Sequence, residues 1–592
     1  MPVPTSEIRP PGVYTEPVEK QLPQLELGRT GVVGFVGITQ RGPTNQAVRV
    51  TSIKQFYDIF GDLRDGFLAP AVEAFFRNGG DECYVVRVVH KQGARLGEVA
   101  SKAAATIYAV SGRPSLFVEA LSEGAWGNRV SVELTLQRPR AQTFLTLDAQ
   151  PGDCSITVRS THGLRPGTLV RLYNEETEVF RYVVAVEEKR LHWAEDSPLD
   201  EKLSATAPTY VEPVELQMRV SGPMGNEVFR DLSLHPASQS FIERVVQERS
   251  RMVRVRSLAG APLSRKELPK EAKGVSLEGG LDGIDGIGPD DFIGLSGGPG
   301  ERSGLFVLEL VDEVDLLAVP DLMWLYRRNS KTPGIPFSTL SDVEVVQEAM
   351  ISQCERLNDR FAILDSPFPD DIARTREYRL LFDTAHAALY FPWVVVEHVG
   401  KRKEVPPCGH VAGLMARLDK DMGVLRPPAN EVLDGVQDLT MVVREEDVGH
   451  LNAEGINCLR AWSTRGIRVW GARTLSSDPQ FRYVNVRRIL DAINKSVRNG
   501  LQWVVFEPNV PSLWKTITRN VTQFLMTLWK QGYFTGGTPE EAFYVKCDEE
   551  TNPPEVRDAG VLHVEIGVAP VRPAEYLVLR VAQEMQGPSS GP

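Results

Sequence analysis

The chain has 592 residues, of which 42% are hydrophobic and 24% are charged, and its formal net charge is −12. Single cores stop growing near ~250 to 300 residues, and no apolar run here approaches the roughly 18 residues that cross a bilayer, so we expect three or more domains and no membrane span. The acidic balance argues against a nucleic-acid-binding protein, because neutralising phosphates requires a basic surface.

Residues 1–24 are predicted to form an extended arm. Prolines recur through this stretch and prevent a helix, at Pro2, Pro4, Pro10, Pro11, Pro17 and Pro23. An arm of this kind needs a partner to stay ordered. The same stretch has prolines and acids where a secretory signal needs a basic patch and an apolar run, so we expect synthesis and assembly in the cytoplasm.

The next segment predicts strands and helices of an α/β unit. The apolar run Gly31–Thr39 predicts a buried strand, and Thr51 or Ser52 is placed to cap a helix. A second helix is predicted over Leu68–Asn78 and a second strand over Cys83–Val89.

Residues 144–208 have a different character. They contain short alternating runs separated by turn signals such as Gly-Asp and Arg-Pro-Gly. This pattern predicts a small β-barrel or sandwich.

From residue 286 to residue 560, amphipathic helices alternate with continuous apolar strands, which predicts a sheet covered on both faces. A helix over Asp342–Leu357 is expected to bury the side chains of Val345, Val346, Ala349 and Met350. Another helix is predicted over Ile372–Ala388. Strands are predicted over residues 361–367, 388–398, 467–474 and 502–508.

Two long helices follow. In Asn485–Gly500 apolar side chains share one face, and the opposite face carries Arg487, Arg488, Lys495 and Arg498. This basic face is either a solvated surface or a contact surface. The second helix, Ser512–Lys530, has a wide apolar stripe that predicts a place in a core.

The chain closes on two predicted strands, Val561–Val571 and Tyr576–Gln583, in which apolar residues alternate with others at period two. Pro570 and Pro573 separate them. An edge strand with unpaired backbone groups invites a strand from another chain.

Several of these stretches carry a family resemblance. They are PPGVYTEPVE and GFVGITQRGPTNQAVRVTSIKQFYDIFGD near the start, PPCGHVAGLMARLDKDMGVLRPPAN over residues 406–430, and FRYVNVRRILDAINKSVRNGLQWVVFEPNVPSLW with the sequence that follows it up to residue 581. Together they resemble the tail sheath proteins of contractile phage tails and phage-tail-like injection particles. Residues 406–430 follow that family's hallmark loop. The resemblance covers nearly the whole chain apart from residues 144–208.

The resemblance implies a mixed α/β and α+β multidomain fold. It has a C-terminal α/β sheath core, extended N- and C-terminal strand arms and an inserted small all-β domain. The implied segments are an N-terminal arm (1–24), the N-terminal part of the core (25–100), a middle domain (101–143 and 209–285), an insertion on the outer surface (144–208), the C-terminal core (286–560), a C-terminal strand arm (561–585) and a disordered tail (586–592).

The resemblance also implies a mechanical function. Copies of the chain would polymerise helically around an inner tube and contract from a metastable extended state, which drives the tube through a target envelope. Terminal arms would link neighbouring subunits by strand exchange, through Val13, Tyr14, Thr15, Val18, Leu577, Val578, Leu579 and Val581. The tube would be contacted by Arg487, Arg488, Lys495 and Arg498.

The implied partners are further copies of the chain, an inner tube protein, baseplate and tail terminator proteins, and sheath paralogues, without nucleic acid and without direct membrane insertion. Assembly is expected in the bacterial cytoplasm, as part of a phage tail or a tail-like particle that is released or docked at an envelope. Phage, bacteriocin and extracellular injection system remain open as the kind of particle.

Two other classes of protein are alternatives to a sheath protein. An enzyme is disfavoured, because no catalytic, cofactor-binding or metal-binding set can be assembled. The run GVVGFVG lies inside a predicted strand, the acidic residues in 282–291 lack the spacing of a calcium loop, and Cys408 with His410 supplies only two ligands. A ring or shell protein that does not contract is the second alternative.

Overall fold

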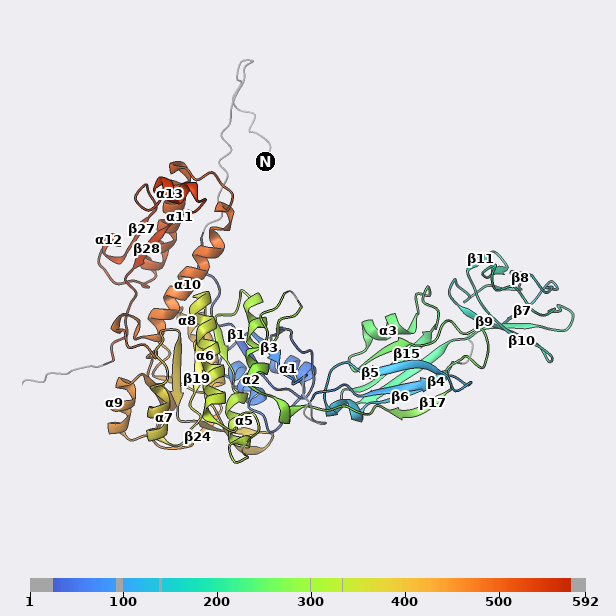
Figure 1. Ribbon diagram of the computed structural model, residues 1–592, viewed down its shortest axis with the longest axis horizontal. Coiled ribbons are helices and arrows are strands. Elements are labelled where there is room, and N and C mark those ends of the chain that lie inside the picture. Colours follow the sequence, from blue (N-terminus) through green and yellow to red (C-terminus); the bar gives the residue numbers. More distant parts are fainter. Residues whose placement is uncertain (1–24, 92–98, 138–140, 299, 333, 576–592) are drawn as a thin grey trace, which may run out of the picture. The chain divides into compact units, whose positions relative to one another are not determined.

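The computed structural model describes residues 25–91, 99–137, 141–298, 300–332 and 334–575 (Figure 1). The chain divides into two compact units, which are treated separately below. The larger unit comprises Thr30–Gly423 and Pro428–Val484, and the smaller unit comprises the remainder. No helix among the described residues is long and apolar enough to cross a membrane.

A nine-stranded sheet forms the centre of the larger unit. Neighbouring strands are parallel from β3 through to β25, and the strands outside this block pair antiparallel. In spatial order the strands are β2 (Val48–Val50), β3 (Cys83–Arg87), β1 (Val33–Gly37), β18 (Leu316–Ala318), β19 (Phe361–Asp365), β20 (Ala387–Phe391), β25 (Ile456–Trp462), β26 (Gly466–Trp470) and β23 (Glu431–Val432). The sheet therefore joins strands from the start of the chain to strands from its second half (Figure 1).

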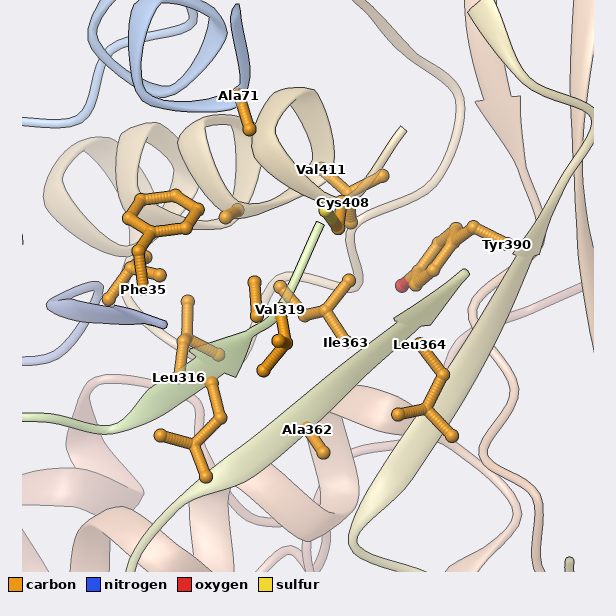
Figure 2. Packing of buried hydrophobic residues seen from close by; sticks show 14 of the residues in the cluster. Phe35, Ala71, Leu316, Val319, Ala362, Ile363, Leu364, Tyr390, Cys408 and Val411 are labelled. Carbon is orange, nitrogen blue, oxygen red and sulfur yellow. The ribbon is translucent and has the colours of Figure 1, made fainter. Parts of the chain in front are cut away.

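Helices and short turns complete this core. The helices are α1 (Ile53–Phe60), α2 (Leu68–Arg77), α4 (Pro289–Ile293), α5 (Asp321–Asn329), α6 (Leu340–Leu357), α7 (Ile372–Arg379), α8 (Cys408–Met422) and α9 (Glu445–Ala453). The short 3-10 turns are η2 (Ile284–Gly286), η3 (Gly304–Leu310) and η4 (Pro479–Phe481). Figure 2 shows Val411 and Cys408 of α8 above the apolar side chains of β18 and β19, with Ala71 of α2 on the other side of α8.

Helix α8 packs unusually close to α2. A Cβ atom on Gly409 would come within 2.3 Å of the carbonyl oxygen of Ala71, and one on Gly413 within 2.4 Å of the carbonyl oxygen of Phe75. Only glycine allows backbone to approach backbone at these two positions, which lie one helical turn apart. Residues 406–430, expected to form a loop, thus contain a helix, because this packing outweighs the weak helix propensity of glycine.

Other expectations for the core were partly wrong. The run 388–398 is two strands: β20 ends at Phe391, and β21 (Val394–His398) belongs to a small sheet with β22 (Lys401–Val405) and β24 (Val436–Leu439). Pro392 lies at this break, and proline has no N–H group with which to continue a ladder.

Two helix predictions also need correction. The helix expected over Ile372–Ala388 ends at Arg379. In α6, Val346 and Met350 are buried as expected, but Val345 is exposed and Ala349 is only partly buried, because the buried stripe runs through Val343, Val346 and Met350.

Buried carboxylates hold distant segments of the core together. Asp315, which immediately precedes β18, accepts hydrogen bonds from the backbone N–H groups of Gly31 at 2.9 Å and Val32 at 2.6 Å. These two residues precede β1. The start of β1 is therefore held against the start of its parallel neighbour β18.

At the other end of β1, the buried carboxylate of Asp321 also binds backbone N–H groups from distant segments. Its carboxylate accepts from the N–H group of Ile38 at 2.7 Å, and from those of Phe67 and Leu68, at the start of α2, at 2.6 and 3.0 Å. Burial raises the pKa of this carboxyl to about 6, although the three hydrogen bonds favour the ionised form.

The larger unit has two further hydrophobic clusters. One lies between the sheet β15-β14-β6-β17 and the sheet β16-β5-β4. Its elements are β4 (Ala104–Tyr108), β5 (Pro114–Ala120), η1 (Ala125–Arg129), β6 (Ser131–Leu136), β14 (Leu216–Gly222), β15 (Gly225–Leu232), α3 (Ile242–Arg249), β16 (Val253–Ser257) and β17 (Ala272–Ser276).

The other cluster confirms the β-rich prediction for residues 144–208. It lies between a four-stranded sheet, β10-β9-β13-β7, and a three-stranded sheet, β11-β12-β8. The strands are β7 (Thr143–Phe144), β8 (Ser155–Thr157), β9 (Leu169–Tyr173), β10 (Glu178–Tyr182), β11 (Ala185–Glu187), β12 (Arg190–His192) and β13 (Tyr210–Pro213). Strand β13 lies just beyond residue 208, so the small domain uses chain from both of its flanks.

The close approach of α2 and α8 generates a stability prediction. Gly409→Ala or Gly413→Ala should each lower the free energy of unfolding by about 1–3 kcal/mol, because the added methyl group forces the two backbones apart. Gly449→Ala is the matched control, since Gly449 lies in α9 with open space around it. Denaturant unfolding followed by circular dichroism measures the change, and equal stability of all three variants would contradict the packing argument.

A second prediction concerns Asp365, the last residue of β19. Its side chain accepts a hydrogen bond from the backbone N–H group of Cys408 at 3.0 Å, and burial raises the pKa of the Asp365 carboxyl to about 7. The native state therefore keeps a proton that the unfolded chain releases near pH 4, so this group lowers stability as the pH rises from about 4 to about 7. The free energy of unfolding of Asp365→Asn should equal that of the parent at pH 4. At pH 8 it should be higher than that of the parent by up to a few kcal/mol, since each unit of pKa shift is worth about 1.4 kcal/mol.

The control for this prediction is Asp383, whose pKa is shifted in the opposite direction. Asp383 accepts two hydrogen bonds from Ser477, and they lower its pKa. Asp383→Asn should therefore be less stable than the parent at pH 7, with the difference vanishing on acidification. Urea unfolding curves between pH 4 and pH 8 test both variants, and parallel pH profiles for Asp365→Asn and the parent would refute the assignment.

Candidate assembly interface

The smaller unit contains a sheet of only two strands. The unit consists of α10 (Val484–Gly500, with Val484 counted in the larger unit), η5 (Gln502–Val504), α11 (Pro511–Lys530), α12 (Pro539–Ala542), β27 (Phe543–Lys546), α13 (Pro554–Asp558) and β28 (Glu565–Val568). Strands β27 and β28 run antiparallel, and within the described part of the chain the sheet has no third strand. A two-stranded sheet is marginal unless another element packs on it, and here the α11 side supplies apolar cover.

The outer edge of β28 faces away from β27. Ala569, just beyond β28, donates its N–H group to the carbonyl of Ala542 at 2.9 Å on the β27 side. Backbone groups alternate in direction along an antiparallel strand, so the N–H groups of Ile566 and Val568 point to the opposite side. This edge has the geometry to accept an added strand.

The predicted alternation in the 561–571 segment is confirmed. Its apolar side chains pack against the core of the smaller unit, at Leu562, Val564, Ile566 and Val568. The regular strand is shorter than expected and covers Glu565–Val568. The pairing then continues irregularly, because the N–H group of Val571 donates to the carbonyl of Tyr533 at 3.0 Å.

Helix α10 anchors the segments that lead to both chain ends. Leu25 lies against Gly500, where a Cβ atom would come within 1.8 Å of the Leu25 side chain. At the other end of the helix, the side chain of Asn485 donates to the carbonyl of Val571 at 3.0 Å. Leu25 and Val571 thus lie at opposite ends of one helix. The expected arm residues, Val13, Tyr14, Thr15, Val18, Leu577, Val578, Leu579 and Val581, lie outside the described residues.

The basic side chains of α10 do not form one exposed face in the subunit. Arg487, Arg488 and Lys495 are 8%, 5% and 7% exposed, and Arg498 alone of the four is exposed. The guanidinium group of Arg487 pairs with the carboxylate of Asp491 at 2.8 Å. Asp491, four residues after Arg487, was the signal in the sequence that this arginine has a partner on its own helix. The predicted tube contact stays a prediction, and Arg498 is the residue best placed to make it.

The segment after α10 also differs from its prediction. Residues Gln502–Pro508 were expected to form a strand, but they contain the turn η5 and then Phe506, whose φ is 71° and whose side chain is fully exposed. A non-glycine residue with positive φ interrupts a strand, and Pro508 follows it. Helix α11 is confirmed and buries Trp514, Ile517, Val521, Phe524, Leu525 and Leu528.

The larger unit has an open groove of about 820 Å³. Its basic residues already have partners: for example, Arg327 pairs with Glu404 at 2.8 Å, and Lys403 donates to the carbonyls of Arg64 and Gly66. This lining contains no pair of nucleophile and base. Among the described residues, no group of three or more His, Cys, Asp or Glu side chains is placed to hold a metal ion.

Comparisons with known proteins identify the family. The model of the phage tail sheath protein central domain matches residues 333–475, and that of the phage tail sheath C-terminal domain matches residues 476–584. The chain is 24% identical over 318 residues to the tail sheath protein of Escherichia phage P2, covering 50% of this chain and 74% of that protein. It is 28% identical over 306 residues to the tail sheath protein of Burkholderia phage BcepMu, covering 48% of this chain and 60% of that protein.

The chain belongs to the contractile tail sheath protein family. The sheath fold also appears in solved structures. The helical sheath of the anti-feeding prophage in its contracted state has a TM-score of 0.52 at 19% identity, and the match covers 98% of this sheath chain and all of that one. The sheath complex of the extracellular contractile injection system PVC, also contracted, has a TM-score of 0.50 at 18% identity.

Proposed function

We propose that this sheath chain polymerises helically around an inner tube and contracts from a metastable extended state to drive the tube through a target envelope. The observation that carries the proposal is the two-stranded sheet of the smaller unit, in which no described strand pairs with the outer edge of β28. A sheet this small gains stability when strands are added to it.

The added strands come from neighbouring copies of the chain. The arms 1–24 and 576–585 supply them, through Val13, Tyr14, Thr15, Val18, Leu577, Val578, Leu579 and Val581. The contacts of Leu25 and Val571 with α10 support this arrangement, because they place described residues that are close to each arm in sequence on one helix. Backbone hydrogen bonds tolerate rotation of the attached bodies, so the mesh stays linked while subunits slide.

Contraction needs no bound nucleotide in this scheme. The extended polymer holds stored strain, and a signal from the baseplate releases it as new surface is buried between subunits. The proposed partners are further copies of the chain, the tube protein, baseplate and terminator proteins, and sheath paralogues. Assembly takes place in the bacterial cytoplasm, in a phage tail or a tail-like particle.

Electron microscopy of the purified chain, alone and with its tube partner, tests the polymer. Hollow striated cylinders of two lengths and widths are expected. Discrete monodisperse particles under all conditions would refute the polymer, and closed rings of one size would favour the ring or shell alternative, which does not contract.

A substitution on the β28 edge tests strand exchange. Ile566→Pro removes an N–H group that points away from β27, and proline is tolerated where that group faces solvent. The subunit should therefore fold, while cylinder formation is lost, because the added strand loses a backbone hydrogen bond and its register. Ile566→Val keeps the N–H group and should polymerise normally. Cylinders formed by folded Ile566→Pro would show that this edge links no subunits.

Charge reversal on α10 tests the tube contact. Arg498→Glu should weaken co-sedimentation of the sheath chain with tubes on the order of tenfold and make the remaining binding less sensitive to salt. Arg519→Glu is the matched control, because Arg519 is an exposed arginine on the neighbouring helix α11. Equal binding by both variants would remove α10 from the tube interface. Arg487 is unsuitable for this test, since it is buried and paired.

A further inference from the structure

The four-stranded sheet of the small β domain carries a row of aromatic side chains on one face. Tyr210 of β13 lies directly between Phe144 of β7 and Tyr173 of β9 in the strand register. The rings of Tyr173 and Tyr210 are 5.6 Å apart between centroids. Adjacent strands are about 4.8 Å apart, so the row spans roughly 10 Å.

This row is exposed although the sheet has a core of its own. The alternate residues of β9 and β13, such as Val170, Leu172 and Val211, point to the other face and form that core. On the aromatic face, Phe144 and Tyr210 remain 37% and 38% exposed. Exposed aromatic side chains gathered in one row mark a binding surface more often than single ones do.

A row of polar side chains lies beside the aromatic row. Gln142 donates its side-chain amide to the hydroxyl of Tyr173 at 3.0 Å, and that hydroxyl lies 3.4 Å from a carboxylate oxygen of Glu212. Arg171 pairs with Glu212 at 3.0 Å and with Glu178 at 2.6 Å. Amide, phenol and carboxylate groups thus form a fixed polar border, with donors and acceptors close together.

Two guanidinium groups flank the ends of the row. The guanidinium carbon of Arg171 lies 4.0 Å from the centroid of the Tyr173 ring, and that of Arg159 lies 5.2 Å from the centroid of the Phe144 ring. The apolar surface left for a ligand is therefore centred on Tyr210. Because Arg171 is held by two carboxylates, the face offers no strong net charge to a ligand.

We propose that this face binds a neutral oligosaccharide. A sugar ring presents an apolar C–H face, which packs on Tyr210 and Phe144, and a rim of hydroxyl groups, which exchange hydrogen bonds with Gln142, Tyr173 and Glu212. The match lies in the pairing of an aromatic platform with a border of hydrogen-bonding groups. The binding itself requires no polymer.

The charge of the domain disfavours a nucleic acid on the same face. Between residues 144 and 208 there are eleven acidic and seven basic residues, whereas binding a phosphate backbone requires a basic excess. A second copy of the chain could also cover this face, and the test must distinguish it from an oligosaccharide.

The test is a printed array of neutral oligosaccharides built from glucose, mannose, galactose and N-acetylglucosamine, probed with labelled full-length chain. Binding to at least one series is expected. Tyr210→Ala should reduce that signal by about tenfold or more, because it removes the central ring, and Tyr210→Phe should retain it. Tyr108→Ala is the matched control, since Tyr108 is an exposed tyrosine on β4 outside the row.

Circular dichroism establishes that each variant is folded, and sedimentation velocity reports self-association. Absence of binding to every series, or equal binding by Tyr210→Ala and the parent, would overturn the proposal. Binding of oligo(dT) alone would overturn it in favour of nucleic acid. Loss of self-association in Tyr210→Ala without any glycan signal would assign the face to contacts between copies.

Discussion

Two carboxylates hold one strand at both of its ends, and the rest of the core depends on them. Asp315 binds the backbone before β1 and Asp321 binds the backbone after it, each across a separation of 283 positions in the sequence. Both lie beside β18, the parallel neighbour of β1. Because a buried backbone N–H group needs an acceptor, these carboxylates specify where the first strand enters a sheet built mostly from the second half of the chain.

This arrangement explains how the fold accommodates its other domains. The chain leaves the large sheet after β3 and returns at β18, and the two β-rich clusters are built from the residues between. Strands β1 and β18 pair directly with each other, so no described strand of the intervening domains is part of the nine-stranded sheet. Residues outside the sheet can therefore present surfaces such as the aromatic row without disturbing its strand order.

The candidate interface was only partly readable from the sequence. Period-two alternation identified the strand around Ile566, and helical periodicity identified α10 and α11. The basic side chains predicted to share one face of α10 are mostly buried. A helical projection shows which residues share a face but not what covers that face. Arg487 is buried by its tertiary surroundings and paired with Asp491, which is visible in the sequence only as a spacing of four residues.

The sequence by itself determined the kinds of element, the presence of a small β-rich domain and the family, since these rest on local periodicity, turn residues and recognisable motifs. The tertiary structure decided the rest. Residues 408–422 form a helix in which Gly409 and Gly413 pack against α2. The run 388–398 belongs to two different sheets. Strand pairing places Phe144, Tyr210 and Tyr173 in one row. These outcomes depend on the pairing of segments distant in the chain, and local patterns do not encode which distant backbone will lie alongside.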